Sequence, residues 1–208
     1  MVDSAAFARN ERGAGPVDSV GVRDRILGAA RSEFAARGFG AASVRTIAER
    51  AGTTAAMINY YFGGKQALHD SVVAEAQGRL FARLNAAAAG GERDGLPVRL
   101  ALAYFDFLVE ERELQRLLLR QMLDRSDHLR ERASEIVGPL RVLLERYFGD
   151  REVAHQYATS VFGAISGYFV YEPVLGALLG DDPLAPEMLQ ARRRHIEELT
   201  RWIERRES

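Results

Sequence analysis

The stretch SVRTIAERAGTTAAMINYYF, residues 43–62, constrains the fold more than any other part of the sequence. Its first half predicts a short helix that begins at Ser43, because serine caps helix N-termini well. Its second half predicts another helix over 54–62, and Gly52 lies in the short turn between the two. Two short helices joined by a turn that contains glycine form a helix-turn-helix. The pattern therefore predicts an all-α N-terminal unit.

The second of these helices has two different faces. Ile58 and Phe62 lie on one face and predict the side that packs on the core. The opposite face carries small, amide and aromatic side chains, which suit the major groove of DNA. Asparagine can pair with adenine, and alanine or methionine can contact a thymine methyl group. Tyr60 and Tyr61 cannot both be core residues on a helix whose buried direction is already set, so we expect a DNA-reading helix.

Basic side chains are concentrated in the same part of the chain. The whole chain has a net charge of −1, whereas residues 21–65 hold seven basic and three acidic side chains. A basic block beside an acidic remainder indicates that this part meets a polyanion. Lys65, the only lysine, stands at the expected start of the next helix, where a cation opposes the helix dipole. We therefore expect Lys65 to contact a DNA phosphate and not to serve folding; the alternative is a solvated surface lysine.

The sequence offers no chemistry for an enzyme. It contains no cysteine, which excludes disulfides, thiolate metal sites and cysteine nucleophiles and is compatible with the cytoplasmic location that we expect. The four histidines stand singly on different segments, and none has the spacing of a metal site. No run approaches the roughly 20 apolar residues of a membrane span. We expect no catalytic residue, no metal and no cofactor.

The N-terminal part of the sequence is similar to a known family. From Val22 to Val73 it resembles the DNA-binding domain of the tetracycline-repressor (TetR) family. The matching residues, in order and spacing, are Ile26, Leu27, Ala29, Ala30, Phe34, Gly38, Phe39, Ser43, Val44, Ile47, Ala48, Ala51, Gly52, Ile58, Tyr61, Phe62, Lys65 and Leu68. The resemblance implies an all-α fold with a three-helix DNA-binding head and a body of about six helices that binds a ligand and dimerises.

The resemblance also implies a domain organisation and two sets of DNA-contacting residues. We expect a flexible arm over 1–20, the DNA-binding domain over 21–66 and the ligand-binding and dimerisation domain over 67–208. The implied base-facing residues are Thr54, Ala55, Ala56, Met57, Asn59 and Tyr60, and the implied phosphate-facing residues are Ser43, Arg45, Thr46, Tyr61 and Lys65. The family often has tyrosine at the position of Asn59, so the operator sequence is not transferable.

Helical periodicity continues through the rest of the chain. It predicts helices near 65–89, 97–111, 113–124, 128–148, 151–179 and 187–206. Pro173 lies inside the fifth of these, where it predicts a kink. The same segment carries a stripe of small residues, and the last helix carries an apolar seam. The dimer interface that we expect from them comprises Thr159, Gly163, Gly167, Leu199, Trp202 and Ile203; the alternative is packing within one chain.

Aromatic residues of the body are the candidates for an effector pocket. These candidates are Phe81, Tyr104, Phe105, Met122, Phe162 and Phe169, although such a set is more often ordinary core. Asp106 shares a helical face with Arg99 and Glu110, which favours an ion-paired stripe over a buried ligand-binding carboxylate.

The function expected from these features is gene regulation. The chain is expected to be a ligand-responsive repressor that binds a palindromic double-stranded DNA operator as a homodimer. A small lipophilic or aromatic effector would release it, and no membrane partner is expected. The alternatives are a helix-turn-helix activator and a protein-interaction adaptor without a small-molecule ligand.

Overall fold

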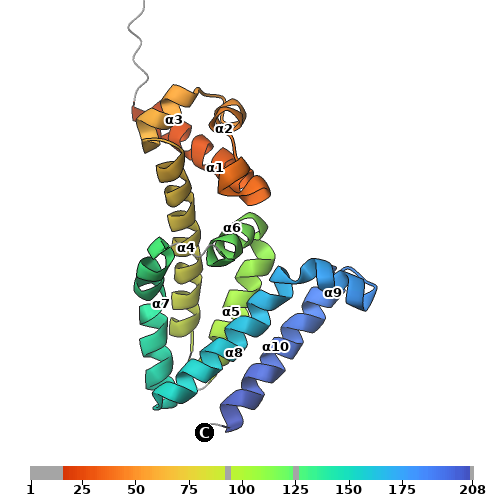
Figure 1. The fold of residues 1–208 in the computed structure, drawn as a ribbon. Helices are drawn as coiled ribbons and strands as arrows, with labels where there is room; N and C mark the ends of the chain where they lie inside the picture. Colours follow the sequence, from red (N-terminus) through yellow and green to blue (C-terminus); the bar gives the residue numbers. More distant parts are fainter. Residues whose placement is uncertain (1–15, 92–94, 124–126, 207–208) are drawn as a thin grey trace, which may run out of the picture.

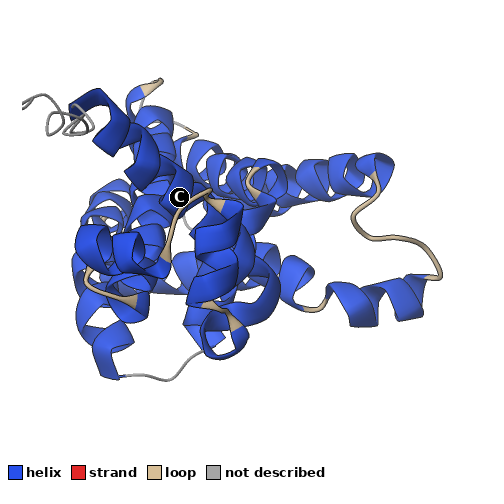
Figure 2. Ribbon diagram, turned by 90° about the horizontal axis from the view of Figure 1, so that it is seen from above, coloured by secondary structure: helices blue, strands red, loops and turns tan. Residues whose placement is uncertain are grey.

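The computed structural model describes residues 16–91, 95–123 and 127–206, and all regular structure in these ranges is helical (Figure 2). The helices are α1 (Pro16–Ala41), α2 (Val44–Arg50), α3 (Ala55–Phe62), α4 (Lys65–Ala89), α5 (Leu96–Glu110), α6 (Arg112–Leu123), α7 (Asp127–Phe148), α8 (Arg151–Val170), α9 (Glu172–Leu179) and α10 (Pro186–Arg206). The expected all-α class is confirmed.

Helices α1, α2 and α3 form a small head at one end of the molecule (Figure 1). The head closes around the fully buried side chains of Phe34, Ile47 and Ile58, one from each helix. α4 runs from the head into the body as one continuous helix, so the expected division at residue 66 falls in its first turn. α4 therefore belongs to both the head and the body.

The N-terminal boundary differs from the expectation. α1 begins at Pro16, so the arm predicted over 1–20 is wrong for residues 16–20, which are helical, and residues 1–15 lie outside the described range. Proline suits the first turn of a helix because a backbone N–H at that position has no acceptor within the helix, so its absence costs nothing. Gly38 breaks the helix: its φ of 73° is a conformation that glycine adopts easily. The chain then makes one more helical turn to Ala41.

The body is built around α5, which packs against α4, α6, α8 and α10. Its side chains Phe105, Phe107 and Leu108 are almost completely buried. Gly95, with φ 74°, and Pro97 begin this helix. The amphipathic pattern of this segment thus places α5 at the centre of the body.

The long helix expected over 151–179 is broken into two. α8 ends at Val170, and α9 leaves it at an angle of 76°. Pro173 stands in the first turn of α9, and a proline there is incompatible with a continuous helix because its ring clashes with the carbonyl four residues before it. None of the residues of α9 is buried. Within the described ranges, no single helix has the length and apolar character of a membrane span, and only the bent α8–α9 pair meets that criterion jointly.

Candidate nucleic-acid interface

α2 is held at its N-terminus by its own cap. The Ser43 side chain accepts a hydrogen bond from the Thr46 backbone N–H at 3.4 Å, as serine at an N-cap should. Ile47 and Ala48 are buried and fix the inner side of the helix. Gly52 follows with φ 63°, and the Thr53 N–H donates to the Ala48 carbonyl at 2.9 Å. The predicted cap and turn are thus confirmed.

α3 repeats this arrangement. The Thr54 side chain accepts from the Met57 N–H at 3.4 Å, and Gly63 ends the helix in the left-handed conformation, with φ 78°. Ile58 is fully buried, as the helical wheel predicted. Tyr61 packs partly against the core, whereas Tyr60 does not, so only one of the two tyrosines contacts the core, as expected.

The outer side of α3 is open to solvent. Tyr60 is 79% exposed, the most exposed of the large hydrophobic side chains in the described part of the chain. Of the residues predicted to face bases, Thr54, Ala55, Ala56, Asn59 and Tyr60 are exposed, and Met57 is half-buried. The structure therefore brings these six together on one short helix that is anchored by a single buried isoleucine.

The residues predicted to face phosphates lie around this helix. Ser43, Thr46, Tyr61 and Lys65 are half-buried, whereas Arg45 is exposed. The Arg45 guanidinium lies 2.9 Å from the Glu49 carboxylate one turn later, and this hydrogen bond raises the pKa of Arg45. The sequence interpretation missed Glu49, although a spacing of four residues was the signal for such a pair. Arg45 thus has a competing anion within the head.

Lys65 has partners inside the protein. Its ammonium nitrogen lies 4.7 Å from the centroid of the Phe39 ring and donates to the Gly40 carbonyl at 3.4 Å. The expectation that Lys65 does not serve the fold is therefore wrong: it joins the start of α4 to the last turn of α1. The two residues that follow Gly38 hold this ammonium, and helix periodicity gives no sign of that contact.

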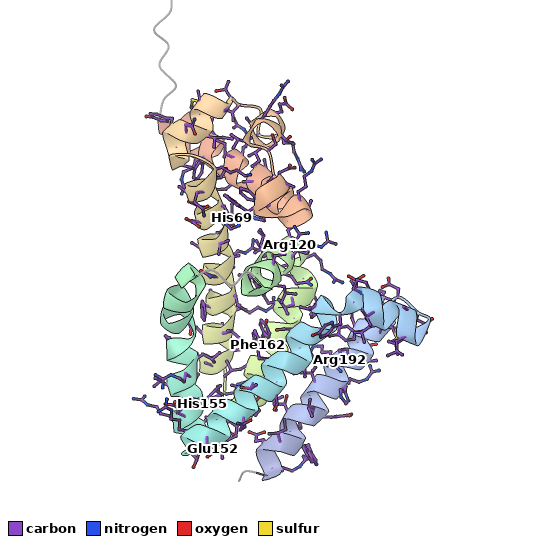
Figure 3. The ribbon with its side chains drawn as sticks, in the orientation of Figure 1. His69, Arg120, Glu152, His155, Phe162 and Arg192 are labelled. Carbon is purple, nitrogen blue, oxygen red and sulfur yellow. The ribbon has the colours of Figure 1, made fainter. Side chains whose placement is uncertain are left out.

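A body residue also reaches the head. Arg120 on α6 donates to the backbone carbonyls of Phe34 and Ala36, at 3.5 and 3.3 Å, just before the break of α1 at Gly38 (Figure 3). These carbonyls lie where the regular hydrogen bonding of α1 is interrupted. On the same two helices, Ser32 donates to Glu113 at 2.5 Å. Nothing in the sequence pattern pointed to Arg120, because its partners are backbone atoms.

Four of the aromatic candidates of the body form two ring pairs. Tyr104 and Phe162 stack with ring centroids 5.6 Å apart, and Phe105 lies 5.7 Å from Phe169. Phe162 is 46% exposed on α8 (Figure 3), so its place in an effector pocket stays a prediction. Phe81 is half-buried, and the side chain of Met122 lies outside the described residues.

The polar groups beside these rings are satisfied within the chain. The Tyr104 hydroxyl shares a 2.8 Å hydrogen bond with Ser166, and burial raises the pKa of Tyr104 to about 12. Asp106 accepts two hydrogen bonds from Arg193, at 2.8 and 2.9 Å, and Glu110 pairs with Arg83. The ion-paired reading of the acidic stripe is confirmed. Within the described residues, no group of three or more histidine, aspartate or glutamate side chains comes together as a metal site.

The residues predicted for a dimer interface lie on α8 and α10, and half of them are exposed. Thr159 and Gly163 are exposed, and a Cβ at Gly163 would meet nothing within 4 Å. Trp202 is 50% exposed, whereas Leu199 and Ile203 are half-buried. Gly167 is half-buried and faces the ring of Tyr171 of its own chain.

These features define an all-α, DNA-binding transcriptional regulator of the helix-turn-helix class. Residues 26–72 match the family model described as bacterial regulatory proteins, tetR family. The Bacillus subtilis (strain 168) protein YttP, described as a "Probable HTH-type transcriptional regulator", is 29% identical over 143 residues, which cover 67% of this chain and 69% of YttP. The N-terminal part of the chain thus matches the TetR family model, and the chain is similar to a helix-turn-helix transcriptional regulator over two thirds of its length.

Solved structures agree in fold. The fatty acid degradation regulator FadR from Bacillus halodurans superposes with a TM-score of 0.63 at 18% identity and covers 85% of this chain and 96% of its own. NalD of Pseudomonas aeruginosa, the secondary repressor of the MexAB-OprM multidrug efflux pump, gives a TM-score of 0.60 at 20% identity, with coverages of 88% and 96%. These similar proteins are all described as regulators or repressors.

Proposed function

We propose that this regulator is a homodimeric repressor that inserts one α3 per chain into successive major grooves of a palindromic operator. The observation that carries the proposal is the exposed outer side of α3, with Tyr60 79% exposed above the fully buried Ile58. A short helix that is anchored on one side and shows amide, methyl and aromatic groups on the other has the shape and chemistry of a recognition helix.

The DNA contacts fall into two proposed sets. Residues of α3 from Thr54 to Tyr60 meet base edges, and Asn59 supplies the bidentate hydrogen bond. Ser43, Arg45 and Thr46 on α2, together with Tyr61 and Lys65, meet phosphates on either side of α3. Phosphate contacts fix the position of the head on the duplex, whereas base contacts select the sequence. In this division residues 21–66 bind DNA, and residues 67–208 bind the effector and the second copy.

The dimer is supported by apolar surface on α8 and α10. Phe162 and Trp202 are both about half exposed on neighbouring helices. Large exposed apolar side chains that cluster on one side of a molecule mark an interaction surface. The open space above Gly163 lets a partner helix approach closely. Pairing through these helices would leave both heads free to meet two half-sites.

The effector is proposed to be small and lipophilic, and to bind in the body. The rings of Tyr104, Phe105 and Phe169 supply apolar surface, and the Tyr104 hydroxyl supplies a polar group. A regulator of fatty acid degradation and a repressor of a multidrug efflux pump share this fold, which makes long-chain acids and apolar drugs the first compounds to test. A protein that binds an operator works in the cytoplasm.

The proposal is tested by selecting bound DNA from a random pool. The selection is carried out with and without a long-chain fatty acid. A palindrome whose affinity falls steeply with salt is the expected result. Light scattering of the free protein should give twice the mass of one chain. Enrichment of no sequence, with affinity independent of salt, would contradict the proposal and favour the adaptor. Tighter binding with effector would favour the activator.

A further inference from the structure

Glu33 on α1 lies in the interior of the head. Its side chain is 2% exposed, and among the side chains that the structure describes it is the only buried one that is acidic or basic. A carboxylate is costly to bury unless opposite charges and hydrogen-bond donors surround it. The groups around Glu33 therefore decide why a glutamate stands there.

Three groups from two helices surround this carboxylate. One oxygen accepts a hydrogen bond from the Ser43 backbone N–H at 3.4 Å and lies 3.4 Å from Arg37 Nε. The other oxygen lies 3.6 Å from Arg50 Nη1. Ser43 is the N-cap of α2, and Arg50 is its last residue. A single buried carboxylate thus contacts both ends of α2.

α2 needs such a contact. It has seven residues, and a helix this short is not stable in isolation. Ile47 and Ala48 bury its inner side, but burial of apolar surface has no direction. A hydrogen bond to the helix N-terminus is directional, and a negative charge there also favours the helix dipole. Glu33 therefore supplies the orientation that the apolar contacts of α2 lack.

We propose that Glu33 is a positioning residue for DNA binding: it holds α2 in the orientation in which Ser43, Arg45 and Thr46 meet phosphates. This inference rests on the proposed DNA interface. Glu33 itself touches no DNA in this arrangement, because it is covered by the head. Arg37 and Arg50 are 60% and 50% exposed, so both guanidiniums can return to water when the carboxylate is removed.

That exposure makes a sharp test possible. Glu33→Leu fills the buried position with an apolar side chain and leaves no buried charge behind, so the fold should be retained. Operator affinity of the folded protein should fall about tenfold, because a hydrogen bond to a charged group is lost at α2. The salt slope should become smaller as phosphate contacts loosen. Glu33→Gln keeps an acceptor for the Ser43 N–H and should restore part of the affinity.

The matched control is Glu75→Leu. Glu75 on α4 forms an ion pair with Arg31 of α1, at 2.5 Å, and is not among the groups that contact α2. This variant should leave the operator affinity and the salt slope of the folded protein unchanged. If Glu33→Leu also keeps both, or loses affinity only in proportion to its unfolded fraction, Glu33 is a structural residue and the proposal is wrong.

A measurement on the unmodified protein covers the case in which Glu33→Leu does not fold. Hydrogen exchange of the Ser43 amide should be slow in the free protein, because this N–H donates to Glu33 and lies outside the hydrogen bonding of the helix itself. Exchange at the rate of an unprotected amide would overturn the proposal. If the unmodified protein binds no DNA at all, the proposed function fails, whereas the Ser43 amide still reports on the contact.

Discussion

The ammonium group of Lys65 lies 4.7 Å from the centre of the Phe39 ring, so the only lysine of the chain joins the start of α4 to the end of α1. The centroid of the Phe39 ring lies 5.1 Å from that of His69 on α4 and 6.3 Å from that of Phe34. The cation is thus held at the edge of the head core, beside α3. A residue in this position can stabilise the head and contact DNA at the same time.

Lys65→Ala should show both effects. The free energy of unfolding should fall by about 0.5–1 kcal/mol because an exposed cation–π contact is lost. The slope of log affinity against log salt should fall by about one unit per half-site because a phosphate contact is lost. Urea unfolding and binding over a salt series measure the two separately. An unchanged salt slope would leave Lys65 with the structural role alone.

Asn59→Ala should relax the operator at one base position per half-site. Asn59 is exposed on α3, and its amide is suited to a bidentate pair with adenine, so its loss should cost about 1–3 kcal/mol there. The salt slope should stay constant because no phosphate contact is lost. Binding to an operator library with every position varied checks this, with Tyr61→Phe as the comparison that should weaken all sequences evenly. Uniform weakening by Asn59→Ala would mean that Asn59 faces the backbone.

Glu49→Gln should strengthen binding to all DNA sequences. Glu49 pairs with Arg45 at 2.9 Å, and this carboxylate competes with a phosphate for the same guanidinium. Its neutralisation should raise affinity by about threefold at low salt, with a diminishing effect as salt screens the charges. Titration of operator and random DNA at two salt concentrations measures this. A gain confined to the operator would argue that Glu49 contacts a base.

Gly163→Leu should separate the dimer into monomers with very weak operator binding. A Cβ at Gly163 meets nothing within 4 Å in the single chain, so the leucine should leave the monomer intact and obstruct only a partner helix. Gly78→Leu on α4 is the matched control, since a Cβ there is equally free. Light scattering decides the matter: a full dimer of Gly163→Leu would place the interface elsewhere.

Arg120→Ala should loosen the contact between head and body. Two hydrogen bonds to the carbonyls of Phe34 and Ala36 are lost, which should destabilise the protein by about 0.5–1.5 kcal/mol. Arg116→Ala removes an exposed arginine from the same helix and controls for the change in helix propensity. Equal urea midpoints for the two variants would show that the Arg120 contact contributes nothing measurable.

Local chemistry let the sequence determine the helices and the recognition motif. Ser43 was readable as a cap because a hydroxyl at the N-cap acts within three residues, whereas the cap formed by Thr54 was not predicted. Ile58 was readable as buried because helical spacing alone sets the faces of α3. The prediction that Asp106 is ion-paired is confirmed, because its helical face carries mainly charged residues. Its partner Arg193 was not predicted. The break at Tyr171, two residues before Pro173, was foreseen as a kink but not as a turn of 76°.

Only the tertiary structure decided the contacts between residues far apart in sequence. Lys65 with Gly40, Glu33 with Ser43 and Arg120 with Phe34 all involve backbone atoms, which every residue possesses and which leave no signature in the side-chain pattern. The exposure of Phe162 was also undecided by sequence, because an aromatic residue on a helix looks the same whether it faces a core or a partner. Periodicity assigns a residue to a face of its own helix, whereas the packing of the helices against one another decides what that face meets.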